Sequence, residues 1–206
     1  MRLGLYGGTF DPIHYGHLLL AETCREQCEL DSVWFLPASV PPHKQTRPIS
    51  KVEDRVEMVQ LALGGQASME VSMLEIERGG VSYTVDTLTQ ITELHPGVEL
   101  FFLMGADSLY EFHSWRQPER ICELAIPVVV RRAGSPAVEI DVLKQIASPE
   151  RLEEIRKFQV EMPVIELSST EIRRRVASEQ SIRYRTPRAV ESFIASKELY
   201  RESGIA

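Results

Sequence analysis

Short apolar runs alternate along the chain with longer segments whose apolar residues have helical spacing. The apolar runs predict strands at residues 2–6, 32–37, 69–76, 98–104, 126–131 and 162–166, and the helical segments predict helices at 16–29, 51–64, 84–95, 117–124, 150–158, 170–177 and 187–197. Strands that alternate with helices form βαβ units with right-handed crossovers. We therefore expect an α/β fold with a doubly wound parallel sheet, and the length of 206 residues fits a single domain over residues 1–206.

Several predicted helices begin with recognisable caps. The segments 50–53 and 168–171 both read Ser-x-x-Glu, the spacing of a capping box. Thr186-Pro187 predicts an N-cap followed by proline in the first helical position. In an open parallel sheet ligands bind beyond the carboxyl ends of the strands. We therefore expect the loops after the first, second, fourth and last strands to form the site.

The turn at residues 7–17, Gly-Gly-Thr-Phe-Asp-Pro-Ile-His-Tyr-Gly-His, lies between the first predicted strand and the first predicted helix. The N–H groups and the dipole at a helix N-terminus favour phosphate. Gly7 and Gly8 would let the chain turn tightly, and Gly16 would leave room for a phosphate group. The segment therefore predicts an anion site.

Two histidines strengthen that prediction. His14 and His17 are three residues apart, which places both imidazoles on one side of the first helical turn. Each could give an N–H to a phosphate oxygen. The alternative is a tight turn with one capping and one packed histidine. Because both share a glycine-rich turn with Thr9, we favour the functional interpretation.

The charge distribution narrows the class of partner. A net charge of −7 argues against a nucleic-acid-binding protein, because contacts to phosphate dominate that affinity. Positive charge gathers locally at residues 173–188, which contain six arginines and one acid. A small polyphosphate suits that pattern. The alternative is a solvated basic helix face, which we favour for Arg174 and Arg175.

Cysteines and hydropathy set further limits. Three cysteines form no even disulfide framework, and a metal site at Cys24 and Cys28 lacks a second pair with ligand spacing, so we expect reduced thiols. The longest apolar run, Leu124–Val130, is too short to span a bilayer, and the N-terminal segment has no export signal. We expect a cytoplasmic protein with no membrane or nucleic-acid partner; the sequence specifies no oligomeric state.

Two motifs resemble a known family. The turn at 7–17 resembles the T/H-x-G-H signature of the nucleotidyltransferase superfamily, in the longer G-G-x-F-D-P-x-H-x-G-H form of the nicotinate and nicotinamide mononucleotide adenylyltransferases. Residues 168–173, Ser-Ser-Thr-Glu-Ile-Arg, resemble the S-S-T-x-I-R element near the C-terminus of these enzymes. Two motifs in the expected order argue against a chance match. The resemblance implies a Rossmann-like fold whose C-terminal helical part, about 168–200, completes an ATP site.

Both motifs and the loop after the fourth strand are expected to bind ATP. The expected ATP-binding residues are Gly7, Gly8, Thr9, Phe10, Gly16, Gly105, Asp107, Ser169, Thr170 and Arg173. The catalytic residues are expected to be His14 and His17, which would act on the phosphates. The resemblance implies that Asp107 contacts the nucleotide ribose. Ser168 is expected to cap its helix rather than to bind a ligand.

The acceptor is implied by the resemblance alone. Residues 82–87 and 112–116 are similar to the two stretches with which the bacterial nicotinate mononucleotide enzymes hold the pyridine ring. This implies that Trp115 stacks on the ring and that the backbone N–H groups of Thr84 and Arg116 meet its carboxylate. The family often has tyrosine at the position of Arg116. For Trp115 the alternative is an ordinary core aromatic.

No general base stands out near the turn, and AMP transfer to a phosphate needs none, because the attacking oxygen is already anionic. The catalyst has to position two anions and to stabilise charge with donors and with Mg²⁺ that accompanies ATP; no metal site built by the protein is expected. Lys44, after Pro41-Pro42-His43, could reach across as a mobile cation, and a surface lysine is the equally weighted alternative.

We therefore expect transfer of AMP from ATP to nicotinate mononucleotide, giving nicotinate adenine dinucleotide and pyrophosphate in NAD biosynthesis. The alternatives are the same transfer to nicotinamide mononucleotide or phosphopantetheine, or an ATP-binding regulator without turnover.

Overall fold

One parallel sheet organises the molecule. The structure is a computed structural model that describes residues 1–41, 49–134 and 138–201. Within these residues the sheet has the order β3-β2-β1-β4-β5-β6. Its strands are β1 (Arg2–Gly8), β2 (Ser32–Pro37), β3 (Met69–Val71), β4 (Glu99–Gly105), β5 (Ile126–Arg132) and β6 (Val160–Met162). The predicted α/β fold with a parallel sheet is confirmed.

The winding direction reverses between β1 and β4. From β1 the chain moves outward through β2 to β3, and it then returns past β1 to place β4, β5 and β6 on the other side. Leu3 of β1 pairs with Ser32 of β2 and with Leu100 of β4. Such a reversal opens a crevice beyond the carboxyl ends of the two strands. The sheet is therefore doubly wound, as predicted.

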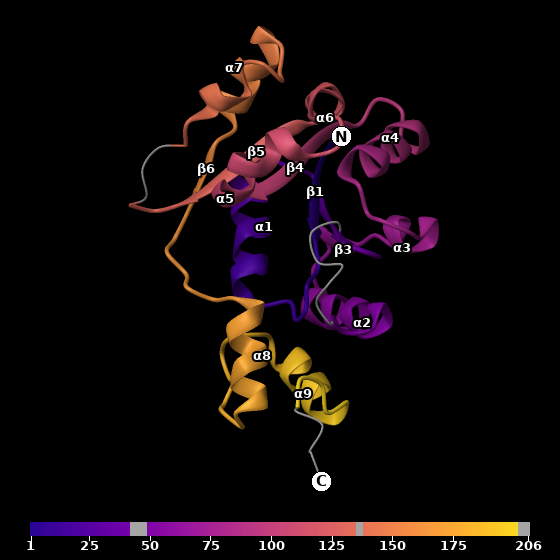
Figure 1. Cartoon of the computed structure of the whole chain (residues 1–206), viewed down its shortest axis with the longest axis vertical. Helices are drawn as coiled ribbons and strands as arrows, with labels where there is room; N and C mark the ends of the chain where they lie inside the picture. The colour runs from indigo at the N-terminus through magenta and orange to yellow at the C-terminus, as the bar shows by residue number, and fades with distance from the viewer. Residues whose placement is uncertain (42–48, 135–137, 202–206) are drawn as a thin grey trace.

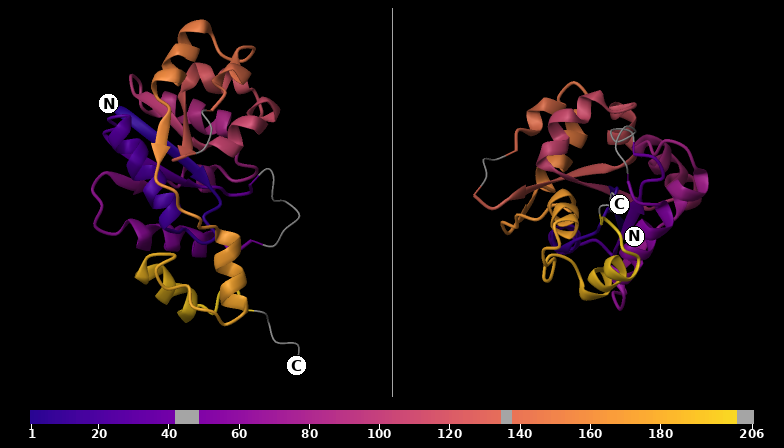
Figure 2. Two further views of the ribbon diagram at one scale, coloured as in Figure 1. Left: turned by 90° about the vertical axis from the view of Figure 1, so that its left-hand side faces the viewer. Right: turned by 60° about the horizontal axis from the view of Figure 1, so that its bottom comes forward.

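Helices cover both faces of the sheet. In the described residues they are α1 (Tyr15–Gln27), α2 (Val52–Leu63), α3 (Leu74–Arg78), α4 (Thr84–Leu94), α5 (Ala106–Glu111), α6 (Pro118–Leu124), α7 (Pro149–Lys157), α8 (Ser169–Ala177) and α9 (Arg188–Ser196), with 3₁₀ turns η1 (Phe112–Ser114) and η2 (Ile140–Leu143). Figure 1 shows α1 on one side of the sheet and α2, α3 and α4 on the other. Helices α8 and α9 lie at the lower end, beside the turn that joins β1 to α1 (Figures 1 and 2).

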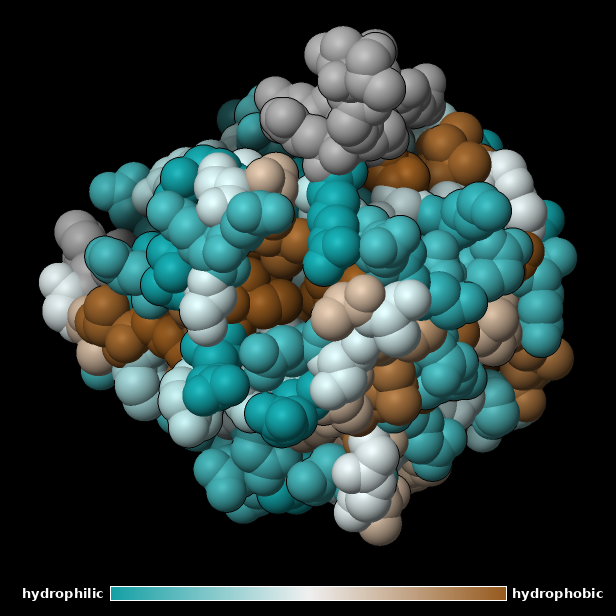
Figure 3. Space-filling view, turned by 90° about the horizontal axis from the view of Figure 1, so that it is seen from below, coloured by the Kyte–Doolittle hydropathy of each residue, from teal (hydrophilic) through white to brown (hydrophobic). Residues whose placement is uncertain are grey.

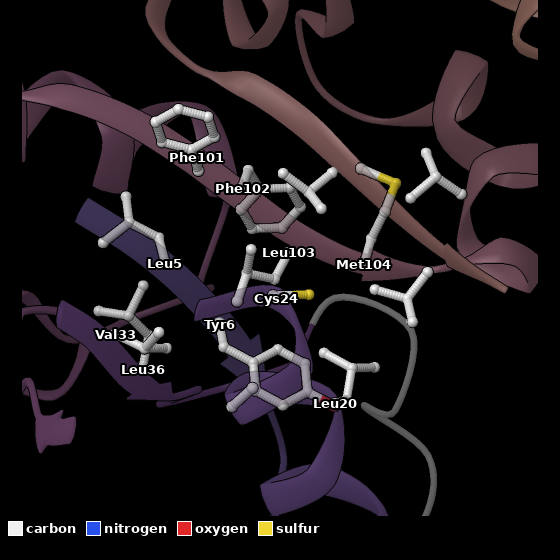
Figure 4. Packing of buried hydrophobic residues seen from close by; sticks show 14 of the residues in the cluster. Leu5, Tyr6, Leu20, Cys24, Val33, Leu36, Phe101, Phe102, Leu103 and Met104 are labelled. Carbon is white, nitrogen blue, oxygen red and sulfur yellow. The ribbon is translucent and has the colours of Figure 1, made fainter. Parts of the chain in front are cut away.

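The central strands are buried on both faces. Leu5, Phe101 and Val33 are almost fully inaccessible to solvent, as expected for parallel strands between two helical layers. Leu20 and Cys24 of α1 pack toward this sheet (Figure 4). The three cysteines are buried free thiols, as predicted. No helix within the described ranges is long and apolar enough to span a membrane.

Two predicted strands have different bounds in the structure. The strand predicted at 69–76 ends at Val71, and Leu74 begins α3, because the apolar residues there also fit one helical turn. The last strand is β6 at 160–162 rather than 162–166. Pro163 follows Met162 and has no N–H with which to continue the ladder. The short helices α3 and α5 were not predicted.

Two predicted caps are wrong. Helix α2 has Lys51 at its N-cap, and the Ser50 N–H donates to the Asp11 carboxylate instead. Helix α9 has Pro187 at its N-cap, and the hydroxyl of Thr186 donates to a backbone carbonyl in the β1–α1 turn. In both cases a tertiary hydrogen bond replaces the local one. Ser168 does cap α8, since its hydroxyl accepts from the Glu171 N–H at 3.1 Å.

The glycines of the turn make space for aromatic rings. Gly7 and Gly8 lie in extended β1 and neither has a positive φ, so the predicted tight turn at these positions is wrong. A Cβ at Gly8 would lie 2.7 Å from the Phe10 ring. A Cβ at Gly16 would lie 3.0 Å from the His14 ring, so the absence of a side chain at Gly16 accommodates this imidazole.

Gly8→Ala is expected to lower the free energy of unfolding by about 1–3 kcal/mol, because Phe10 is buried and cannot move away from the added methyl group. Urea denaturation measures the change. Gly64→Ala is the matched control, because its Cβ would meet no atom closer than 3.6 Å. Equal stabilities of the two variants would contradict this packing role for Gly8.

Candidate active site

The turn between β1 and α1 is held by side chains from distant segments. Four of its carbonyls accept hydrogen bonds within 2.7–3.0 Å. Each carbonyl accepts from one side chain: Thr9 from Arg55 Nη1, Asp11 from Arg173 Nη1, Pro12 from Ser169 Oγ, and Ile13 from Thr186 Oγ1. A trans peptide directs its N–H opposite to its C=O. The N–H groups of Phe10 and Ile13 therefore face away from the donors that bind Thr9 and Pro12.

Arg55 was not predicted from the sequence. It lies on α2 and is only 1% exposed. Besides Thr9, its guanidinium donates to the carbonyls of Ser39 and Ser50. Burial lowers the pKa of this group, whereas the charge of Asp11 raises it. An arginine on the apolar face of a predicted helix, between Val52 and Val56, was the available signal.

The two histidines are stacked. Their ring centroids lie 3.7 Å apart with an interplanar angle of 21°. The backbone N–H of His14 donates a hydrogen bond to the ring atom Nδ1 of His17 at 3.2 Å. A neutral His17 therefore carries its proton on Nε2. Helix α1 begins at Tyr15 and has no acidic residue in its first turn, so its dipole is not offset there.

His14 is neutral in the folded protein. The residue is only 5% exposed, and burial lowers its pKa from 6.5 to about 4. A neutral imidazole still offers one N–H donor. The His14 ring can therefore offer one N–H to a ligand without carrying a charge near neutral pH.

A cavity of about 370 Å³ opens beside this pair. His14, Gly16 and His17 line it from the start of α1, and Gly105 and Asp107 line it from the end of β4 and the first turn of α5. A Cβ at Gly105 would meet open space. The structure thus brings together the predicted loops after the first and fourth strands, at the point where the winding reverses.

Residues not expected from the sequence complete this cavity. Arg131 and Arg132 at the end of β5 lie on its wall, with the exposed Tyr110 of α5. Arg131 forms an ion pair with Glu161 of β6. The position of these arginines at a strand end next to β4 was the signal that could have found them.

The second motif lies against the turn. The Ser169 hydroxyl donates a hydrogen bond to the Pro12 carbonyl. To donate to a phosphate, as predicted, it would have to give up this hydrogen bond. Arg173 reaches the Asp11 carbonyl at 2.7 Å and Thr170 Oγ1 at 3.3 Å. None of these side chains lines the cavity of about 370 Å³. Their roles toward ATP remain predictions.

The other predicted residues of the turn occupy different surroundings. Phe10 is buried, and its ring lies 5.2 Å from that of His17, so only its backbone can meet a ligand. Gly7, Gly8 and Thr9 are partly buried at the end of β1. Lys44 lies outside the described residues.

A second pocket, of about 150 Å³, contains the predicted acceptor residues. Thr84, Trp115 and Arg116 all line it. Cavities of about this size hold a six-membered ring such as benzene. Thr84 is the first residue of α4, where backbone N–H groups have no acceptor within the helix. The structure thus brings together the three residues that the family resemblance implied for the acceptor.

Trp115 both packs and lines the pocket. Its ring contacts Phe102 and Phe112 at centroid distances of 5.7 and 5.3 Å. Its Nε1 atom is buried and has no hydrogen-bond partner in the described part of the chain. The core interpretation and the binding interpretation of this residue are therefore compatible.

Arg116 joins the two sides of the pocket. It lies 4.7 Å from the centroid of the Tyr83 ring, and its Nη1 lies 3.2 Å from an Asp86 carboxylate oxygen. Both partners lie at the start of α4. The arginine thus fixes the α4 N-terminus relative to the segment after η1.

The buried carboxyl group of Glu75 is hydrogen-bonded behind this pocket, to Thr87 and to the pocket residue Ser82. Glu75 is 6% exposed and accepts a hydrogen bond from the Thr87 hydroxyl at 2.8 Å. Burial raises its pKa, although hydrogen bonds from Thr87 and Ser82 act in the opposite direction. Ser82 Oγ also accepts from the Ser39 N–H at 2.9 Å. This network links the loop after β2 to the segment before α4.

Comparison with known proteins agrees with this geometry. The family model described as cytidylyltransferase-like matches residues 5–175. A probable nicotinate-nucleotide adenylyltransferase of Thermomicrobium roseum is 45% identical over 200 residues, which cover 97% of this chain and 92% of that protein. A probable nicotinate-nucleotide adenylyltransferase of Thermus thermophilus is 44% identical over 201 residues. The aligned part covers 98% of this chain and 100% of that protein.

A solved structure shares the fold. It is the Plasmodium falciparum nicotinic acid mononucleotide adenylyltransferase complexed with NaAD, with a TM-score of 0.71, 19% identity and coverage of 97% of both chains. Fold and family model together define a nucleotidyltransferase. Within that class the chain belongs to the nicotinate-nucleotide adenylyltransferase family. The family expected from the two motifs is confirmed.

In the ligand-free protein His14 is expected to stay neutral down to about pH 5, because burial holds its pKa at about 4. A ¹⁵N–¹H NMR titration of the imidazoles checks this, with His14→Gln used to assign the signal. A His14 midpoint above pH 6 would contradict the prediction.

The same shift affects stability. Between pH 6.5 and about 4 the unfolded chain binds a proton at this position and the folded chain does not. Stability therefore falls as pH falls through that window. His14→Gln is expected to remove this part of the pH dependence in urea denaturation.

Proposed function

We propose that the protein transfers AMP from ATP to nicotinate mononucleotide, forming nicotinate adenine dinucleotide and releasing pyrophosphate. The observation that carries the proposal is the pair of pockets at the carboxyl ends of the strands: one contains His14 and His17, and the other contains Trp115 and Thr84. The names of the curated relatives support it, as does the NaAD with which the Plasmodium enzyme is complexed.

The reaction suits the groups that are present. A phosphate oxygen of the mononucleotide attacks the α-phosphorus of ATP, and the bond to the bridging oxygen of the leaving pyrophosphate breaks. The attacking oxygen is anionic, so no side chain has to remove a proton. His14 and His17 would donate N–H groups to phosphate oxygens whose charge changes in the transition state. The α1 N-terminus acts in the same direction.

Helices α8 and α9 would complete the ATP site. Arg173 lies beside the turn and would add a charge-assisted contact to the phosphates. Asp107 would contact the nucleotide ribose from the cavity wall. Lys44 stays a predicted substrate contact. We place the activity in the cytoplasm, where ATP is abundant.

Nucleotidyltransferases that use ATP generally require a divalent metal ion, and we propose Mg²⁺. Mg²⁺ in such sites keeps several waters and is bound largely through substrate phosphates. The described residues contain no group of three or more His, Cys, Asp or Glu side chains that could hold a metal ion. The cation would neutralise charge on the triphosphate when it is bound.

The acceptor pocket favours an acid over an amide. A carboxylate only accepts hydrogen bonds, and the N–H groups at the start of α4 and at Arg116 only donate. A carboxamide would turn its own NH₂ toward one of these donors. Each mismatch of this kind costs roughly 1–3 kcal/mol when water is excluded. The proposed acceptor is therefore the nicotinate form.

The enzyme is expected to prefer nicotinate over nicotinamide mononucleotide on the order of a hundredfold in kcat/KM. Pyrophosphate release from ATP, measured with each mononucleotide and with phosphopantetheine under one set of conditions, provides the test. Trp115→Ala is the matched variant: it should weaken use of both mononucleotides with little change in their ratio. Equal kcat/KM values for acid and amide would overturn the acceptor assignment, and no release with any acceptor would favour a regulator.

His17→Ala is expected to lower kcat about a hundredfold, the scale seen when one preorganised donor to a transition state is removed. Circular dichroism establishes that the variant is folded. His95→Ala, at an exposed histidine beyond the end of α4, serves as the control and should keep its activity. Near-normal turnover of folded His17→Ala would exclude the catalytic role.

A further inference from the structure

The turn between β1 and α1, called the phosphate turn below, contains one buried carboxylate that takes no part in the proposed chemistry. Asp11 is 3% exposed. Its Oδ2 accepts from the Ser50 N–H at 3.2 Å, and its Oδ1 accepts from the Tyr200 hydroxyl at 2.6 Å. Its own carbonyl binds Arg173. The side chain and the backbone of one residue thus connect three distant segments.

Tyr200 comes from the far end of the chain. It follows α9, which packs against α2, and its hydroxyl also lies 3.8 Å from the sulfur of Met58 on α2. The Tyr200 backbone has φ +63°, a left-handed conformation that residues other than glycine rarely adopt. An unusual backbone conformation therefore places this hydroxyl under the turn.

The hydrogen bond has a fixed direction. Burial, and then the charge of Asp11, raise the pKa of the Tyr200 phenol far above its usual value. The phenol therefore stays protonated, and its O–H donates a hydrogen bond to the carboxylate. A buried carboxylate oxygen that lost this donor would have to find another partner or shift its position.

Movement of Asp11 would reach the catalytic groups directly. Asp11 is three residues before His14, and the carbonyls on both sides of it, at Thr9 and Pro12, are held by Arg55 and Ser169. The Tyr200 hydroxyl contacts this set of hydrogen bonds through the Asp11 carboxylate, to which it donates. A change at the carboxylate would therefore tilt the segment that leads into the histidine pair.

We propose that Tyr200 is a positioning residue for adenylyl transfer, acting through the Asp11 carboxylate to set the phosphate turn. The proposal rests on the proposed function for the reaction that is assayed. The segment after α9 thereby belongs to the support of the site, although Tyr200 does not line either pocket described above.

Tyr200→Phe removes one hydroxyl and keeps the ring. It is expected to lower kcat about tenfold, because small displacements of positioned groups are costly in rate, while the KM for the mononucleotide changes less than about twofold. The assay is run without urea, at a temperature where denaturation curves show the variant fully folded. A residue with a merely structural role would lower the denaturation midpoint and leave kcat per folded molecule unchanged, which would overturn the proposal.

A double-mutant cycle tests the route through Asp11. If Tyr200 acts through that carboxylate, Asp11→Asn combined with Tyr200→Phe lowers kcat no further than Asp11→Asn alone. Multiplied effects of the two changes would overturn the route. Tyr184→Phe is the matched control, because that ring is 84% exposed, and it should behave as the unmodified protein. If Tyr200→Phe is unfolded at the assay temperature, Asp11→Asn alone is judged by the same criterion.

A readout independent of the acceptor separates this proposal from the proposed function. Binding of a non-hydrolysable ATP analogue is measured by calorimetry for the same variants. A weaker or enthalpically altered association in Tyr200→Phe, but not in Tyr184→Phe, supports a displaced phosphate turn even if the acceptor assignment fails. Identical binding together with unchanged kcat overturns the positioning role.

Discussion

The structure depends on satisfying the carbonyls of one irregular turn. Residues 9–13 leave the sheet ladder and are not yet helical, so their backbone groups have no partners within a regular element. Buried carbonyls without hydrogen bonds are costly. Side chains from α2, α8 and the segment before α9 supply the donors. Because the carbonyls of Thr9 and Pro12 point to these donors, the N–H groups of Phe10 and Ile13 face the opposite way, and the nearby N-terminus of α1 favours an anion.

The same constraint explains the position of the C-terminal helices. Figures 1 and 2 show α8 and α9 beyond the end of the sheet, where they cover no strand. Seen from below, that face is mostly hydrophilic, with apolar side chains between the hydrophilic ones (Figure 3). On α8, Arg174 forms an exposed ion pair with Glu171, and such exposed pairs contribute little stability. The buried bonds of Arg173, Ser169 and Thr186 to the turn therefore orient this part of the chain.

The sequence predicted the parallel sheet and the first pocket because each rests on a local signal, whereas the residues of the second pocket were implied only by the family resemblance. Apolar runs located the central strands, and the glycine-rich turn located the first pocket. Thr186 and Tyr200 could not be found in this way, since their partners lie 173 and 189 residues away. Arg55 had a local signal, its position on the apolar face of a predicted helix, but that signal did not point to Thr9, which lies 46 residues away. The tight turn expected at Gly7 and Gly8 is wrong, since both lie in an extended strand and the Phe10 ring fills the space that Gly8 leaves open, whereas Gly16 both accommodates the His14 ring and lines the cavity of about 370 Å³.

The histidine stack shows how burial and binding are coupled in the site. Two imidazolium rings with centroids 3.7 Å apart would repel each other strongly where water is excluded. Burial of His14 removes this repulsion by keeping its ring neutral, so the pair can stay stacked before a ligand arrives. A triphosphate beside the pair changes the balance, because a nearby anion favours the protonated form of an imidazole. If ATP binds beside His14, as proposed, nucleotide binding and proton uptake by this ring are thermodynamically linked, so that each favours the other.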